Sequence, residues 1–443
     1  MSSVKIIRNA MVLTMDAGFH FFRKGTVVIE DDQIAAVGED KDVKTEYKSV
    51  QLIDGMGKLV MPGIINAHTH IPMTIFRGYA DDLSLHEWLY DYIFPVESAF
   101  INAKNVVAGA ELAIAEMIKS GTTTFNDMYY FADDIAQLAD RTGIRAFLSE
   151  AIIDFPAPNS PSPLKGLERG EMLMKKWNHH RHITISSSAH SPYSCSRDYI
   201  VKARELSDTY KVPFNIHVAE TRREYDQSIK KHGLSPVGYL DSIGALNERT
   251  VAAHGVHLDD EDIRVLAKKG VSVAHNPECN MKLASGVAPV PELLNAGVNV
   301  GLGTDGVASN NNMDMFEEMN SAAIIHKLNQ KNPSVMDAQS VVYMATMGGA
   351  KALGADGQIG SLEVGKKADI LILDMNQPHS HPVYNIYSLL VYSMRGSDVD
   401  TVLIDGKVVM ENKQLLKINE EEVFAKVDSI AAAVMQKNGI VQK

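Results

Sequence analysis

The sequence predicts an α/β fold, with a (β/α)8 barrel of the TIM type joined to a small β-sandwich domain formed from both chain termini. Two observations predict it. Eight short apolar runs lie in the middle of the chain, each followed by enough residues for a helix. The two chain ends instead carry β-branched stretches separated by Asp, Gly and Asn. We therefore expect residues 1–60 and 356–443 to form one composite β domain, and residues 61–355 to form the barrel.

The chain ends read as short strands and turns. The predicted strand regions are residues 5–15, 25–39, 49–60, 368–375 and 398–412. The sequences DDQ, DGMG and Asp405–Gly406 are typical of hairpin turns between them. Residues 419–439 have helical spacing instead, and we expect that helix to pack on the outside.

The apolar runs of the middle segment predict the barrel strands. In order they are IINAHTH, TTTFNDMYY, IRAFLSEAII, ITISSSAHSPY, FNIHVAE, TVAAHGVH, VSVAHNP and VNVGLGTDG. They alternate only weakly between apolar and polar residues, as expected for parallel strands buried on both faces. Amphipathic stretches such as AKNVVAGAELAIAEMIKSG lie between the runs and predict the outer helices.

Polar residues capable of chemistry stand near the C-terminal ends of these runs. They are His68, His70, Asp127, Glu150, His190, His217, Glu220, His254, His275 and Asp305. In a β/α barrel the C-terminal strand ends form the active-site face, so we expect these side chains to gather on one rim.

The types of these residues indicate a metal centre. His68 and His70 are one residue apart and face the same side of an extended strand. Together with His217 and Asp305 they could surround one divalent ion, with zinc expected and Fe²⁺ as the alternative, and leave one position open. Glu220 follows His217 closely enough to carry protons, and Asp305 could share that work. His254 is either a further ligand or a group that stabilises developing charge.

Composition excludes several classes of function. The chain has 443 residues, a net charge of -12 and two cysteines. Nucleic-acid binding needs clustered basic residues, and a thiolate metal site needs paired cysteines, so we expect neither. No membrane-length apolar stretch and no basic leader is present in the sequence, and we expect a cytoplasmic protein with no membrane partner. Homo-oligomer formation is left open.

Longer strings resemble a known family. PGIINAHTH, HVAET, AAHGVH and GLGTDGVASNN resemble the amidohydrolase superfamily over nearly the whole chain. HTHIPMTIFRGYADDLSLHEWL, AHSPYSCS and HNPECNMKLASGVAPV resemble the 5-methylthioadenosine/S-adenosylhomocysteine deaminases. Binuclear members of the superfamily use a lysine at the end of strand four. The fourth run here has no lysine, so the resemblance implies a mononuclear, deaminating enzyme.

The resemblance also implies roles for individual residues. His68, His70, His217 and Asp305 would bind the ion, and Glu220 and His254 would handle protons and the tetrahedral intermediate. The substrate-binding residues would be Glu220 and three others. Glu97 would hold the ribose hydroxyls, Trp88 would line the nucleoside pocket and His190 would contact the base. The plainer alternatives are a core aromatic for Trp88 and a solvated helix residue for Glu97.

Glu150 departs from the family pattern. Members that accept S-adenosylhomocysteine use arginines for its carboxylate, and Glu150 stands where the pattern puts one of them. A carboxylate there would repel that tail, so an uncharged 5′ group is expected to fit better. Alternatively, Glu150 is a buried residue paired with Arg145 or Arg222.

The expected reaction is deamination of the adenine 6-amino group of 5′-methylthioadenosine, adenosine or S-adenosylhomocysteine, giving the inosine analogue and ammonia. The alternatives are a deaminase or chlorohydrolase of another amino-heterocycle, such as a triazine or a guanine-like ring, and a nucleoside-binding protein without catalysis.

Overall fold

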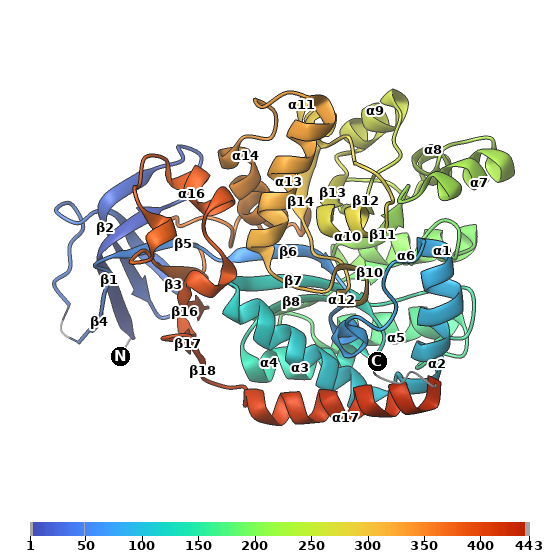
Figure 1. Ribbon diagram of the computed structural model, residues 1–443, viewed down its shortest axis with the longest axis horizontal. Coiled ribbons are helices and arrows are strands. Elements are labelled where there is room, and N and C mark those ends of the chain that lie inside the picture. The colour runs from blue at the N-terminus through green and yellow to red at the C-terminus, as the bar shows by residue number, and fades with distance from the viewer. Residues whose placement is uncertain (1–2, 48, 439–443) are drawn as a thin grey trace.

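The structure is a computed structural model that describes residues 3–47 and 49–438. The outermost parts of the two predicted terminal segments, residues 1–2 and 439–443, and residue 48 lie outside the described residues. Figure 1 shows a helix-wrapped barrel beside a separate sheet, in which the blue N-terminal and orange-red C-terminal segments meet.

Each of the eight predicted runs forms strand structure in the described part of the chain. The barrel strands are β6 (Ile64–Thr69), β7 (Thr122–Tyr129), β8 (Arg145–Glu150), β9 (Ile183–Ile185), β10 (Ser187–Ser188), β11 (Phe214–Val218), β12 (Thr250–His254), β13 (Ser272–His275) and β14 (Asn299–Leu302). They pair in parallel along the orders β6-β7-β8-β9 and β10-β11-β12-β13-β14. Ser186 separates β9 from β10, so the fourth run contributes two short strands.

The barrel closes between its first and last strands. A parallel bridge joins Thr69 to Asp305, just after β14. Beneath it, the Asn66 amide donates to Thr304 Oγ1 (2.7 Å), and the Thr304 N–H donates to Asn66 Oδ1 (3.1 Å). The first histidine strand and the last carboxylate are therefore held side by side.

Helices surround the strands. They are η1 (Ile71–Phe76), α1 (Leu85–Glu87), η2 (Trp88–Ile93), α2 (Phe94–Phe100), α3 (Ala103–Lys119), α4 (Ala132–Thr142), α5 (Pro163–Lys176), α6 (Arg197–Tyr210), α7 (Arg222–His232), α8 (Pro236–Ser242), α9 (Asp260–Lys269), α10 (Pro277–Lys282), α11 (Val290–Asn295), α12 (Val307–Asn310), α13 (Met315–Gln330), α14 (Ala338–Tyr343), η3 (Met344–Gly348) and α15 (Gly349–Ala352). Local signals set their ends: Asp259 and Asp262 form a capping box at α9, and Gly143 ends α4 with φ 86°.

No helix of residues 3–47 and 49–438 is long and apolar enough to cross a membrane.

Both chain ends contribute to one nine-stranded sheet. Its strands are β1 (Val4–Leu13), β2 (Phe21–Glu30), β3 (Gln33–Glu39), β4 (Gln51–Asp54), β5 (Lys58–Pro62), β15 (Ile370–Asp374), β16 (Val399–Ile404), β17 (Lys407–Glu411) and β18 (Gln414–Leu415). The order is β18-β17-β16-β15-β5-β1-β2-β3, with β4 on β1. The antiparallel pair β5–β15 joins the two ends. The C-terminal segment also holds η4 (Pro378–Ser380), α16 (Ile386–Tyr392), η5 (Gly396–Asp398) and α17 (Glu420–Asn438), and α17 runs along α3 (Figure 1).

A buried ion-pair group connects the barrel to this sheet. Arg145, at the start of β8, donates through Nε to Asp369 Oδ2 (2.8 Å) and through Nη2 to Asp405 Oδ1 (2.5 Å). Arg181 reaches the other oxygen of Asp405 at 2.9 Å. The two arginines hold the pKa of Asp405 below its usual range, although burial opposes them. Arg145 is therefore committed to the sheet, and it does not pair with Glu150.

Replacement of Arg145 by methionine should destabilise the protein strongly. Methionine keeps the buried apolar stem but leaves the buried Asp369 without its cation and Asp405 with Arg181 alone, which costs about 3–5 kcal/mol of unfolding free energy. Urea unfolding followed by circular dichroism measures this loss. Arg141→Ala is the control: its exposed pair with Glu111 is worth less than about 1 kcal/mol. Equal losses in the two variants would contradict the structural role of Arg145.

Candidate active site

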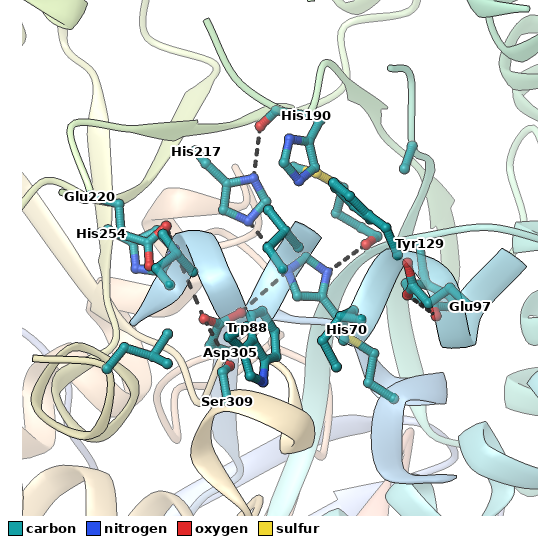
Figure 2. A pocket seen from close by; sticks show the side chains of 18 of the residues that line it. His70, Trp88, Glu97, Tyr129, His190, His217, Glu220, His254, Asp305 and Ser309 are labelled. Carbon is teal, nitrogen blue, oxygen red and sulfur yellow. Dashed lines mark hydrogen bonds and ion pairs between the residues drawn. The ribbon is translucent and has the colours of Figure 1, made fainter. Parts of the chain in front are cut away.

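Four side chains bring their ligand atoms together at the C-terminal rim of the barrel. They are His68 and His70 at the end of β6, His217 in β11 and Asp305 after β14, with one ligand atom from each within 4.8 Å of the others. Nε2 of His70 lies 3.2 Å from both His217 Nε2 and Asp305 Oδ1, and His68 Nε2 lies 3.5 Å from the same carboxylate oxygen. Figure 2 shows His70, His217 and Asp305 pointing toward one another.

Backbone carbonyls fix the imidazole protons away from this point. His70 Nδ1 lies 2.6 Å from the Met128 carbonyl oxygen, and His217 Nδ1 lies 2.7 Å from that of His190. A carbonyl oxygen only accepts, so each Nδ1 carries the proton and each Nε2 presents a lone pair to the centre. His68 Nε2 is buried without a hydrogen-bond partner among the described residues. These nitrogen and oxygen donors fit one divalent ion such as zinc.

The ligand Asp305 is held by three donors. The Gly306 N–H donates to Oδ1 (2.8 Å), and the Cys279 thiol and the Ser309 hydroxyl donate to Oδ2 (2.8 and 3.3 Å). Its backbone lies in the left-handed region at φ 61°. Barrel closure at Thr69 and these donors together keep the carboxylate turned toward the histidines.

Glu220 and His254 stand beside the four ligands. Burial, and to a lesser degree the Asp305 carboxylate, raises the pKa of Glu220, so this side chain can hold a proton closer to neutral pH. His254 Nε2 lies 3.7 Å from Glu220 Oε2 and 3.9 Å from Asp305 Oδ2. The Nδ1 of His254 is 3.0 Å from Asn280 Oδ1, which orients the ring. His254 thus lies between the proton carrier and the carboxylate ligand, outside the group of four.

Glu224 is a supporting residue that the sequence reasoning missed. Its carboxylate accepts the backbone N–H groups of Ala219 (3.0 Å) and Glu220 (2.8 Å), and burial raises its pKa to about 7. It thereby holds the turn that presents Glu220, in which Ala219 has φ 53°. The signal was present: Thr221 caps α7, and Thr-x-x-Glu is a capping pattern.

A partly open pocket lies over these side chains. Apolar and aromatic groups line most of it, with a few polar groups that converge on one point, as is usual for small-molecule sites. Trp88, Glu97 and His190 all line it, as the resemblance implied (Figure 2). Glu220, His254 and Asp305 also line it, so the predicted catalytic and substrate-binding residues meet in one cavity, with Glu150 as the exception.

The pocket side chains offer distinct polar groups. Trp88 Nε1 is buried and has no partner among the described residues, so its N–H is free for a ligand. Tyr129 donates its hydroxyl to Glu97, and burial raises the pKa of Glu97 to about 7. Burial lowers the pKa of His190 to about 3, so that ring is neutral at physiological pH.

Three strand-end residues lie elsewhere. Asp127 accepts the N–H of Ile71 (2.6 Å) and so supports the backbone after His70. His275 faces His326 of α13, with 3.1 Å between their Nε2 atoms. Glu150 accepts from the Asn159 amide and from the Ala132 N–H (3.1 Å), and it is not among the residues that line the pocket. It pairs with neither Arg145 nor Arg222 in the described structure, because Arg222 bonds Asp226.

Comparison with known proteins decides the family. Residues 59–409 match the model of the amidohydrolase family. The chain belongs to the amidohydrolase family. Its α/β fold is the TIM-barrel type of amidohydrolases, as the sequence predicted.

Amidohydrolases similar to this chain along its whole length are named as nucleoside deaminases. A 5-methylthioadenosine/S-adenosylhomocysteine deaminase of Syntrophus aciditrophicus is 45% identical and covers 97% of both chains. A 5′-deoxyadenosine deaminase of Methanosarcina mazei is 44% identical and covers 98% of both. The crystal structure of an adenosine deaminase from Xanthomonas campestris with bound zinc is 35% identical, with a TM-score of 0.95 over 98% of both chains.

Removal of one ligand should abolish tight metal binding. His68→Ala takes away a buried imidazole whose Nε2 has no other partner, and we expect metal affinity to fall at least about 100-fold. Metal content after dialysis, measured by plasma mass spectrometry, checks this. His275→Gln is the control, because it changes a strand-end histidine outside the group of four and should retain the ion. A His68→Ala protein that keeps a full equivalent would refute the ligand assignment.

Proposed function

We propose that this amidohydrolase removes the 6-amino group of an adenine nucleoside, giving the inosine analogue and ammonia. The observation that carries the proposal is the position of Glu220, a buried carboxylate in the same pocket as His254 and three of the four proposed ligands, His70, His217 and Asp305. Deamination needs such a group, since nitrogen leaves only after it is protonated. The names of the full-length relatives support the same reaction and the same class of substrate.

A divalent ion bound by these ligands supplies a Lewis acid that lowers the pKa of a water molecule. The protein's own part is proton transfer and orientation. Glu220 takes a proton as water adds to C6 and gives it to the adjoining ring nitrogen. The proton of the new C6 hydroxyl then passes to the amino group as the C–N bond breaks, which leaves a C6 carbonyl and ammonia. His254, 3.7 Å from Glu220, stabilises the charge that develops on the attacking oxygen, and Asp305 shares the proton.

The other pocket residues hold the nucleoside. Glu97 accepts hydrogen bonds from the ribose hydroxyls, and Tyr129 orients its carboxylate. Trp88 packs on the nucleoside and offers its free N–H. His190, held by the Ser194 hydroxyl at 2.7 Å from Nδ1, contacts the base as a neutral ring.

We also infer the identity of the metal ion and the boundaries of the two domains. Zinc is the ion, in keeping with the zinc bound to the Xanthomonas deaminase, while Fe²⁺ suits the same donors. Residues 61–355 form the barrel domain. Residues 1–60 and 356–443 form the composite β domain, built on one nine-stranded sheet, in which Ile7, Val27 and Leu403 belong to a core separate from that of the barrel.

An uncharged 5′ group suits the pocket best. The residues described as lining it include the acidic Glu97, Glu220 and Asp305 but no lysine or arginine. Within this lining, the carboxylate of an amino-acid tail would meet acidic side chains with no cation to offset them. The arginines nearest along the surface, Arg222 and Arg223, line the adjoining pocket, which shares Tyr193 and Leu283 with this one. Glu150 lies outside the lining and bonds Asn159 and the Ala132 N–H, so we assign the repulsion of the tail to the lining carboxylates and not to Glu150.

Glu220→Gln should retain the metal and lose turnover. Glutamine keeps the shape but cannot carry the proton, and general acid–base catalysis contributes about 10²–10⁴-fold to the rate. The measurement is kcat from the ultraviolet change as adenine becomes hypoxanthine, beside metal content. Glu292→Gln, on the exposed face of α11, is the control and should turn over normally. A Glu220→Gln enzyme of undiminished kcat would remove Glu220 from the mechanism.

The enzyme should prefer nucleosides whose 5′ group carries no charge. With zinc-loaded protein we expect 5′-methylthioadenosine, adenosine and 5′-deoxyadenosine to be turned over with kcat/KM at least about tenfold above that of S-adenosylhomocysteine, because a carboxylate left unpaired in a closed site costs more than about 1.4 kcal/mol. Parallel assays of the four compounds test this. Preference for S-adenosylhomocysteine would contradict the charge argument. No turnover of any of the four would refute the nucleoside assignment and point to another amino-heterocycle.

A further inference from the structure

A second cluster of metal-ligand side chains lies at the opposite end of the barrel from the active site. We propose that Asp140, His180 and His182 form a second metal site, which takes a divalent transition ion such as zinc. Asp140 lies near the end of α4, and His182 immediately precedes β9, so the cluster is on the N-terminal rim. The inference is independent of the proposed function, because these residues are remote along the strands from the catalytic rim.

The distances suit three ligands on one ion. Nε2 of His180 and Nε2 of His182 lie 3.5 and 3.3 Å from the same oxygen, Asp140 Oδ1. One ligand atom from each of the three residues lies within 4.8 Å of the others. With metal–ligand bonds of about 2.0–2.1 Å, donors around tetrahedral zinc are about 3.4 Å apart. The two distances from Asp140 Oδ1 to the histidine nitrogens match this spacing.

Local structure fixes both imidazoles before any ion binds. The His182 carbonyl accepts the Ala146 N–H (2.9 Å), which ties this residue to β8. The His180 N–H donates to the Trp177 carbonyl (3.1 Å), and the ring of His180 packs edge-on against Trp177 and His182. The site is therefore largely preformed, and little conformational freedom is lost on binding.

The present contact between His182 and Asp140 is better explained with a cation between them. His182 Nε2 is buried and makes no hydrogen bond among the described residues, although Asp140 Oδ1 lies 3.3 Å away. Buried polar atoms normally have a partner, and an ion held between this ring nitrogen and the carboxylate would supply one.

The surrounding charges permit a cation. Arg145 is neutralised by Asp369 and Asp405. Arg181, next in sequence to both histidines, bonds Asp405 and Asp32. The Asp140 side chain is 50% exposed, so the site is open on that side for entry of the ion and for water as remaining ligands.

Calorimetric titration of Zn²⁺ into the untagged protein, with its catalytic site already loaded, tests the proposal. We expect one further equivalent of zinc per chain. His180→Gln, His182→Gln and Asp140→Asn should each weaken that binding at least about tenfold. The matched control is His179→Gln, which alters the exposed neighbouring histidine and should bind the further equivalent as the unaltered protein does.

Either of two results would overturn the proposal. Absence of a further equivalent, or equal affinity in His180→Gln and the unaltered protein, would overturn the proposal. If His182→Gln does not fold, the more exposed His180 and Asp140 variants decide the matter. Deaminase activity of the loaded enzyme should be the same in all variants, so failure of this site and failure of the proposed reaction are told apart.

Discussion

The convergence of three imidazoles and one carboxylate at a buried point is the constraint on which the rest of the structure depends. His68, His70, His217 and Asp305 come from strands at the beginning, middle and end of the barrel. Such polar groups are costly to bury unless they are paired or bind a metal. The parallel strands supply the position, and the closure between β6 and β14 brings the last ligand to the first two.

A second layer of contacts gives these groups their orientation. Carbonyl oxygens set the protons of His70 and His217, and Glu224 holds the turn before Glu220. Ala219, His254 and Asp305 all have positive φ, a conformation that costs free energy for residues other than glycine. These three lie at the ends of successive functional strands, so the local strain is located where side chains are turned into the pocket, and the closed barrel maintains it.

The sequence was enough to predict the barrel strands and the convergence of His68, His70, His217 and Asp305 on one rim, for a physical reason. Strand ends of a parallel barrel share one rim, so spacing along the chain translates directly into proximity. Side-chain direction follows less simply: His275 turns to His326, and Glu150 bonds the loop at Asn159, although both end barrel strands. Contacts between segments that are far apart in the sequence could not be predicted from it. Arg145 meets carboxylates 224 and 260 residues away, and no local pattern indicates which ones.

That same arginine bears on how the protein matures. Asp369 and Asp405 follow every barrel strand along the chain, and β15, the partner of β5, lies with them. While the ribosome is still adding this segment, every barrel strand has already been made, yet Arg145 is without its counter-charges and β5 has an open edge. The contacts of the barrel with the sheet are therefore completed only after residues 369–405 have been made, and until then the growing chain exposes one edge of β5.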